Sequence, residues 1–283
     1  MAVTTADVLK IALDMAGFSE TPADSAIYFP GENIRRIIIG IDMEAPELLL
    51  AKQEGFDLVI SHHPKGGGAL LRFADVLSRH VEFMTAHGVP EPVARDAVGE
   101  LIYDARCQAQ AANYDRAPSM ARRLQIPYMN IHLPLDEIGR KRMVAVVDSL
   151  DPAATVKELL GAFEHRLPEC RAAATEIELR VGLASHPIGH AAVIHAAGTN
   201  GGIPVARALY NHGVDTVIYI HCSGPDSRRL NQDFHDQGRN LIVIGHMTGD
   251  SLGINPFAEE LISRGLDVTC MSGIIRNENL QIP

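Results

Sequence analysis

Residues 56–64 read Phe56-Asp57-Leu58-Val59-Ile60-Ser61-His62-His63-Pro64, a short apolar run that ends in two histidines and a proline. Its length and β-branched residues predict a buried strand, and the glycines at 66–68 end that strand abruptly. The histidines then lie where the strand leaves the sheet, the place where parallel α/β sheets carry their chemistry. Neighbouring side chains at a strand end point in different directions, so the pair suits two adjacent metal ions better than one. On the dipeptide alone, two loop histidines with ordinary hydrogen bonds are the simpler interpretation.

The residues before this run complete a β-α-β unit. Residues 34–41 form a β-branched run that predicts a strand. Residues 45–52 predict a helix, with Pro46 in its first turn and Gly55 after its end. A right-handed crossover between parallel strands is the strong default for such a unit. We therefore predict an α/β protein.

The second half of the chain repeats this pattern. Residues 213–221 contain Gly-Val-Asp followed by an apolar strand that ends at His221. Residues 55–62 contain Gly-Phe-Asp followed by an apolar strand that ends at His62, and the two stretches align with a gap of one residue. We predict two similar halves based on β-α-β units, residues 1–145 and 146–283. In the first half, the pattern near 70–125 is mostly helical.

Composition excludes several classes of protein. The 283 residues carry a formal charge of −10, which disfavours nucleic-acid binding because that rests on Lys and Arg contacts to phosphates. No secretory signal and no stretch of about 20 apolar residues is present, so we expect a cytoplasmic protein without a membrane partner. The four cysteines are scattered, form no C-x-x-C pair and predict neither a disulfide framework nor a cysteine zinc site.

Three predicted strand ends carry residue types that bind metals. They are His62-His63, His132 with Asp136, and His246 with Asp250. A helix would place either four-residue pair on one face, but Pro134 and Gly249 favour loops. Imidazole with carboxylate suits Zn, Mn, Fe, Co or Ni. Any one pair is more often structural, whereas three pairs at matching topological positions predict a metal site.

Other residues give weaker signals. The glycines between Gly198 and Gly202 fit neither dinucleotide nor P-loop spacing, so a tight turn before a helix is the better interpretation. No G-x-S-x-G nucleophile elbow is present. His132 or His221 could transfer a proton, although a structural role fits either equally well. Three further histidines are interpreted as structural: His186, His190 and His195.

The segments at 61–64, 132–136 and 245–250 resemble the three signature segments of the Nif-three-like family, and the tandem His-His-Pro is the most specific of them. The loop and helix at 197–209 and the following Gly213-Val214-Asp215 strand also resemble that family. Members are often described as type 2 GTP cyclohydrolase I. The resemblance implies two intertwined halves, a metal site in the cleft between them, and a homo-oligomer, often a hexamer.

The resemblance also implies a ligand set. His62 and Asp136 would bind one divalent ion, His63 and His246 a second, and Asp250 would bridge both. His132 matches a nearby histidine that need not be a ligand, and we assign it a catalytic role.

Three departures from the family pattern concern this site. Asp250 replaces the usual Glu and is one methylene shorter. Lys65 and three glycines replace the usual apolar residues after His-His-Pro. The interval between His63 and Asp136 is longer than usual, consistent with an inserted segment that could cover the site or alter an oligomer interface.

Two functions compete at this level. The first is a dinuclear metal-dependent hydrolase acting on a small molecule such as a nucleotide or heterocycle, since paired ions can activate water for attack on a polarised centre. The second is a non-enzymatic metal-binding adaptor that acts through protein partners.

Overall fold

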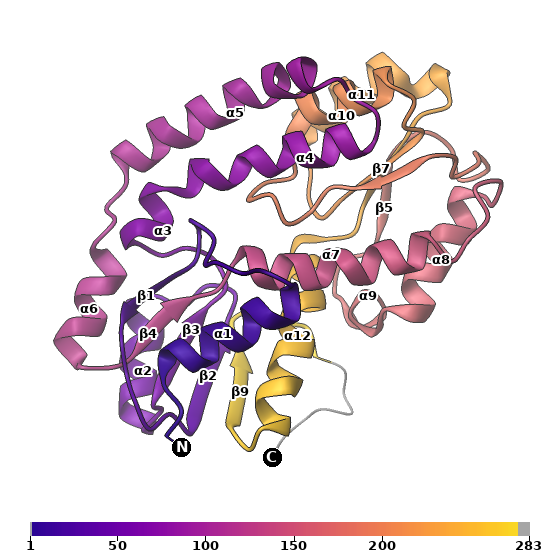
Figure 1. The fold of residues 1–283 in the computed structure, drawn as a ribbon. Coiled ribbons are helices and arrows are strands. Elements are labelled where there is room, and N and C mark those ends of the chain that lie inside the picture. Colours follow the sequence, from indigo (N-terminus) through magenta and orange to yellow (C-terminus); the bar gives the residue numbers. More distant parts are fainter. Residues whose placement is uncertain (1, 277–283) are drawn as a thin grey trace.

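The polypeptide forms two β-sheets with helices packed around them, and the computed structural model describes residues 2–276 (Figure 1). The first sheet has the order β1-β4-β3-β2-β9, formed by β1 (Ala26–Phe29), β4 (Tyr128–Asn130), β3 (Leu58–Ser61), β2 (Arg36–Gly40) and β9 (Asp267–Met271). The second has the order β5-β8-β7-β6, formed by β5 (Glu178–Val181), β8 (Asn240–Val243), β7 (Thr216–Tyr219) and β6 (Ala191–Val193).

The two sheets follow one plan. In the first, β2, β3 and β4 are parallel and β1 is an antiparallel edge strand beside β4. In the second, β6, β7 and β8 are parallel and β5 is the antiparallel edge strand beside β8. Strands β3, β7 and β8 are buried along their whole length, as continuous apolar runs in parallel sheets should be. The predicted α/β fold with two similar halves is confirmed.

The helices surround and join the sheets. None within residues 2–276 is long and apolar enough to span a bilayer. In chain order they are α1 (Thr5–Ala16), α2 (Ala45–Glu54), α3 (Gly67–Leu71), the 3-10 turn η1 (Phe73–Ser78), α4 (Arg79–Ala86), α5 (Glu91–Ala111), α6 (Arg116–Leu124), α7 (Leu133–Val147), α8 (Val156–Arg166), α9 (Pro168–Ala172), α10 (Gly202–Asn211), α11 (Gly224–Phe234), η2 (His235–Gln237) and α12 (His246–Ser263).

The halves exchange elements. Strand β9 follows the second sheet in the chain but pairs in parallel with β2 of the first sheet. Conversely, η1, α4 and α5 of the inserted segment pack through Leu77, Met84 and Val98 on the apolar core of the second sheet. The halves are therefore intertwined, and a division of the chain at residue 145 stays a prediction.

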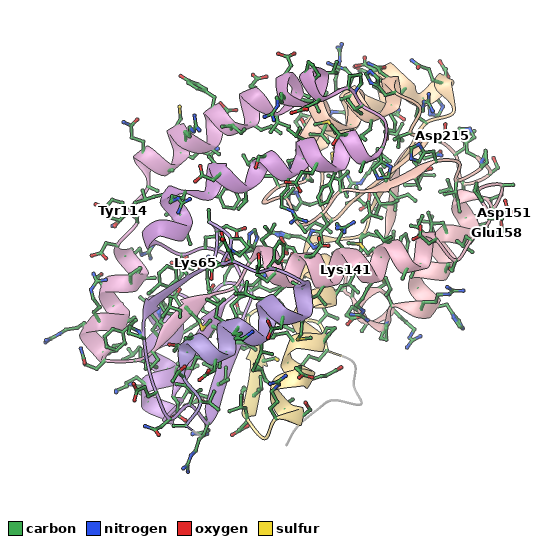
Figure 2. The ribbon with its side chains drawn as sticks, in the orientation of Figure 1. Lys65, Tyr114, Lys141, Asp151, Glu158 and Asp215 are labelled. Carbon is green, nitrogen blue, oxygen red and sulfur yellow. The ribbon has the colours of Figure 1, made fainter. Side chains whose placement is uncertain are left out.

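Helices α7 and α12 pack closely between the sheets because glycines line their contact. A Cβ atom on Gly253 would lie 1.8 Å from the carbonyl oxygen of Leu135, and one on Gly139 would lie 3.1 Å from the carbonyl oxygen of Gly249. Lys141 of α7 also donates a 2.7 Å hydrogen bond to the carbonyl of Ala16 at the end of α1 (Figure 2). These contacts hold the first turns of α7 and α12 side by side.

The prediction that Pro134 and Gly249 favour loops is wrong. The 132–136 and 246–250 segments lie at the starts of helices, since Pro134 fits the start of α7 and Gly249 allows α12 to pack on Ile220. Helix α12 continues from His246 through the internal Pro256.

A side chain from α7 compensates for this internal proline. A proline leaves the carbonyl four residues earlier without its helical partner. Arg142 Nη1 donates to that carbonyl, on Leu252, at 2.7 Å. A tertiary contact that the sequence does not reveal therefore allows the helix to continue.

Candidate metal centre

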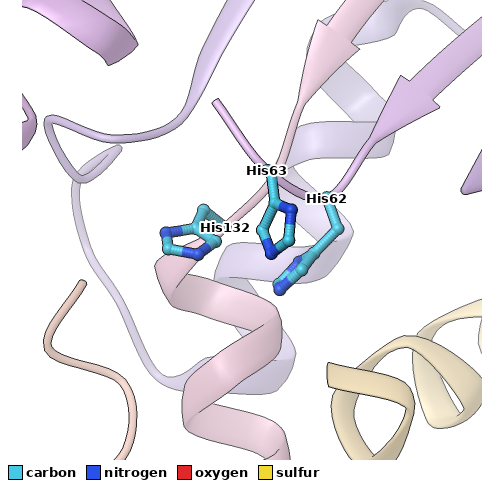
Figure 3. A group of neighbouring side chains, drawn as sticks. All are labelled: His62, His63 and His132. Carbon is cyan, nitrogen blue, oxygen red and sulfur yellow. The ribbon is translucent and has the colours of Figure 1, made fainter. Parts of the chain in front are cut away.

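The carboxyl ends of the parallel strands in both sheets meet at one cluster of histidines and aspartates. His62 and His63 follow β3, and His132 follows β4 at the start of α7 (Figure 3). Asp136 lies in the first turn of α7, His246 is the first residue of α12, and Asp250 lies one turn further along α12. Helix N-termini stabilise negative charge, so the first turn of α7 favours an ionised Asp136.

Asp136 is surrounded by imidazole nitrogens. Its Oδ1 lies 3.1 Å from His62 Nε2 and 3.5 Å from His195 Nε2, and its Oδ2 lies 3.7 Å from His132 Nε2. The carboxylate is buried, and burial raises its pKa, but the charges of His195, His132 and His62 outweigh burial and lower the pKa below its usual value. Asp136 is therefore ionised at neutral pH.

Asp250 joins the two tandem histidines and His246. Its Oδ1 lies 3.7 Å from His62 Nε2, and its Oδ2 lies 3.3 Å from His63 Nε2 and 3.5 Å from His246 Nε2. Burial raises the pKa of Asp250, but nearby His62, His63 and His246 lower it well below the usual range. Its two oxygens thus face different histidines, which is the arrangement a bridging carboxylate needs.

Hydrogen bonds fix how three of the imidazoles present their ring nitrogens. The Nδ1 atom of His62 lies 3.0 Å from the carbonyl oxygen of Ile131. The Nδ1 atom of His63 lies 2.9 Å from a carboxylate oxygen of Asp42, and that of His132 lies 2.8 Å from a carboxylate oxygen of Asp24. A carbonyl or carboxylate oxygen can only accept, so each Nδ1 donates. In the neutral ring, the Nε2 lone pair then points toward the cluster, as in metal-binding histidines whose other nitrogen is held by an oxygen.

Four buried polar atoms in the cluster have no hydrogen-bond partner within residues 2–276: His62 Nε2, His195 Nε2, Asp136 Oδ1 and Asp250 Oδ2. Unpaired polar atoms are costly to bury, and these four lie at the centre of one cluster. Burial alone would lower the pKa of His62. Without a cation, the negative charges of Asp250 and Asp136 outweigh burial and raise the pKa of His62 well above its usual value. A divalent cation would satisfy the same atoms, so the residues fit a metal site.

The possible ligand atoms form three groups within which all atoms lie within 4.8 Å of one another. The groups are His62 with His63 and His132, His63 with His246 and Asp250, and His62 with Asp136 and Asp250. The structure thus brings together all six residues predicted from the sequence: His62, His63, His132, Asp136, His246 and Asp250. It shows a cluster that could hold metal, while the identity and number of ions stay predictions.

A cavity of about 300 Å³ opens onto the cluster. The cavity is lined by candidate ligand residues and by Thr199, Asn200 and His221 from the second half. Phe73 of η1 and Gln108 of α5 also line it, so the helical segment near 70–125 forms part of the cavity. Its size is at the lower end of small-molecule sites.

Sequence reasoning missed three residues of this centre. His195 lies two residues after the end of β6, close to a strand end as His62 is after β3, so the same strand-end rule would have identified it instead of a structural role. Asp42 likewise follows β2. Asp24 lies in a loop, and nothing local marks it, because its bond to His132 joins residues far apart in the chain.

The fold and cluster define an α/β protein of two similar halves with a candidate metal site between its sheets. The chain is 48% identical to a NIF3 superfamily protein from Sphaerobacter thermophilus, with a TM-score of 0.92 over 96% of this chain and 100% of that one. The chain belongs to the NIF3 superfamily.

Two more distant structures share the fold alone. Reduced HcgD from Methanocaldococcus jannaschii is 12% identical, with a TM-score of 0.56 over 95% of this chain and 98% of that one. A Bacillus cereus protein related to NIF3 is 10% identical, with a TM-score of 0.50 over 99% of each chain. No family model and no curated protein matches the chain.

Proposed function

We propose that this protein is a dinuclear metal-dependent hydrolase acting on a small molecule. The observation that carries the proposal is the group of four unpartnered buried polar atoms beside a cavity of about 300 Å³. Divalent ions held there would supply polarisation of a substrate carbonyl and activation of water. A site that only stabilised the fold would not need an adjoining cavity.

The proposed ligands follow the facing atoms. His62 and Asp136 would hold one ion, and His63 and His246 would hold the other. Asp250 spans both, since its two oxygens face His62 on one side and His63 with His246 on the other. Asp250 is shorter than the usual Glu, but its oxygens still lie within 3.7 Å of an Nε2 atom of each of the three histidines. His246 and Asp250 lie one turn apart in α12, which places both on the same face of the helix.

His132 is the proposed proton carrier. Asp24 holds its Nδ1–H, which leaves Nε2 free to accept a proton at the cavity wall. This pairing of a buried carboxylate with Nδ1 is the one that orients general-base histidines elsewhere. His132 Nε2 is 3.7 Å from Asp136 Oδ2, close enough to serve a reaction at the cluster.

The first test is elemental analysis of protein purified without chelator or metal-affinity resin. Two equivalents of a transition metal per chain are expected, falling by at least one in Asp250→Asn. Asp233→Asn is the matched control, because Asp233 lies on α11, does not line the cavity, and pairs with Arg207 and Arg229. Equal metal content in Asp250→Asn and wild type would contradict the assignment.

The second test is turnover of nucleotides, phosphoesters and cyclic amides by metal-loaded protein. Activity that disappears in Asp136→Ala and His246→Ala supports the hydrolase. If no substrate is turned over and metal removal lowers only stability or assembly, the adaptor alternative gains support. We also propose a homo-oligomer on the family resemblance, and light scattering measures its subunit number.

A further inference from the structure

The part of the cavity lining formed by Thr199, Asn200 and His221, called the wall below, contains no Lys, Arg, Asp or Glu. Within residues 2–276, no Lys or Arg lines the cavity. Lys65 lies just outside, and its ammonium group is paired with Asp42 and, at 3.4 Å, with Glu44 (Figure 2). A polyphosphate needs several cationic partners. Apart from the proposed ions, this wall offers it none.

The loop before α10, residues 198–201, also offers a phosphate no free backbone amide at Gly201 or at Gly202, the first residue of α10. Free backbone amides at a helix N-terminus can bind anions. Here the amide of Gly201 donates to Thr199 Oγ1 at 3.2 Å, and the amide of Gly202 donates to Asn200 Oδ1 at 2.8 Å. The loop's own side chains thus use these amides.

The same contacts fix the orientation of the Asn200 amide. Its Oδ1 faces a backbone N–H, which can only donate, and its Nδ2 lies 2.5 Å from the carbonyl oxygen of His221, which can only accept. The assignment of oxygen and nitrogen in this side chain is therefore set by the main chain.

This orientation fixes the tautomer of His221. Asn200 Nδ2 donates to His221 Nδ1 at 2.6 Å, so Nδ1 accepts and the ring proton lies on Nε2. In a doubly protonated ring, the Nδ1–H of His221 and the Nδ2–H of Asn200 would both be donors and would repel each other. The ring lines the cavity and packs against His246, with ring centroids 4.7 Å apart. No hydrogen bond from His221 Nε2 occurs among residues 2–276, which leaves a free N–H donor beside the proposed ions.

We infer that this wall binds the uncharged, carbonyl-bearing part of the substrate, with His221 Nε2–H donating a hydrogen bond to the carbonyl oxygen. A small cyclic amide has the matching chemistry, and a nucleoside triphosphate does not. The inference rests on the proposed function for its substrate, but the tautomer can be tested without any turnover.

The tautomer is tested by long-range ¹H–¹⁵N correlation spectra of zinc-loaded protein at pH 7.5, with the His221 signals identified by their loss in His221→Gln. Wild type is expected to show protonated Nε2 and unprotonated Nδ1. Asn200→Leu removes the donor that faces Nδ1, so a larger share of Nδ1-protonated ring is expected in this variant. A protonated Nδ1 in wild type, or a tautomer ratio in Asn200→Leu equal to that of wild type, overturns the inference.

Recognition is tested by titrating the zinc-loaded protein with 2-pyrrolidone, a cyclic amide. The His221 Nε2–H signal is expected to shift. Affinity is expected to be retained in His221→Gln, which keeps an N–H donor at about the Nε2 position, and to fall about tenfold in His221→Leu. Absence of a shift, or equal affinity in His221→Leu and wild type, overturns the wall's role.

The two proposals fail separately. Hydrolysis of a panel compound without any response of His221 to 2-pyrrolidone would support the proposed function and contradict the role of this wall. Binding of 2-pyrrolidone through His221 without turnover of any compound would support the role of the wall and contradict the hydrolase proposal.

Discussion

Substitution of Gly253 by alanine tests whether close packing of α7 and α12 builds the metal centre. The new Cβ would lie 1.8 Å from the Leu135 carbonyl oxygen, whereas Cβ atoms essentially never come within 3.0 Å of another heavy atom. The helices must therefore separate by about 1.2 Å, the difference between these distances. The atoms of Leu135 that the new Cβ would meet are all backbone, so no side-chain rotation relieves the clash.

The expected magnitude is the balance of two effects. Alanine is a better helix former than glycine by about 1 kcal/mol, and overpacking costs about 1–3 kcal/mol or more. Because this clash involves backbone, we expect Gly253→Ala to lower the free energy of unfolding by about 2 kcal/mol, measured by urea denaturation. Separation of Asp136 from Asp250 should also reduce bound metal, measured by elemental analysis.

Gly99→Ala in α5 is the matched control. A Cβ there meets nothing within 4 Å, so this variant should be stabilised by up to about 1 kcal/mol. Gly253→Ala with stability equal to or above wild type, and full metal content, would refute the claim that this helix contact positions the carboxylates.

Three further predictions concern stability. Burial lowers the pKa of His80 in the native protein to about 3. As the pH falls below about 6.5, the unfolded chain therefore binds a proton at His80 and the native protein does not. The free energy of unfolding consequently decreases on acidification. Urea denaturation of His80→Gln between pH 6 and 4.5 should show a pH slope shallower by up to about 1.4 kcal/mol per unit; an unchanged slope would assign the acid sensitivity to other groups. Arg142→Met leaves buried Glu169 without its 2.9 Å ion pair and the Leu252 carbonyl without a donor, so unfolding should become easier by about 3 kcal/mol; a loss under 1 kcal/mol would argue against this role. Chelation of bound metal should lower the melting temperature of wild type by more than that of Asp250→Asn, which is expected to hold at least one equivalent less; calorimetry measures both shifts, and equal shifts would place the metal elsewhere.

The sequence determined the strands and their functional ends because those signals are local. An apolar run that stops at His62-His63 marks a buried strand and its exit within nine residues, and the runs before His132 and His246 do the same. The repeat of this pattern was sufficient to predict two similar α/β halves. The six predicted site residues needed only that rule and the family resemblance.

Tertiary structure decided the features that depend on contacts between distant segments. Only the packing of α7 on α12 shows why Pro256 lies inside a helix, since Arg142 compensates for its missing hydrogen bond. Only the meeting of the two sheets brings His195 to Asp136, and only the pairing of β1 with β4 within the first sheet brings Asp24 to His132. Local periodicity reports which face of an element is buried, whereas partners for polar atoms are chosen by the fold, where burial makes an unpaired group costly.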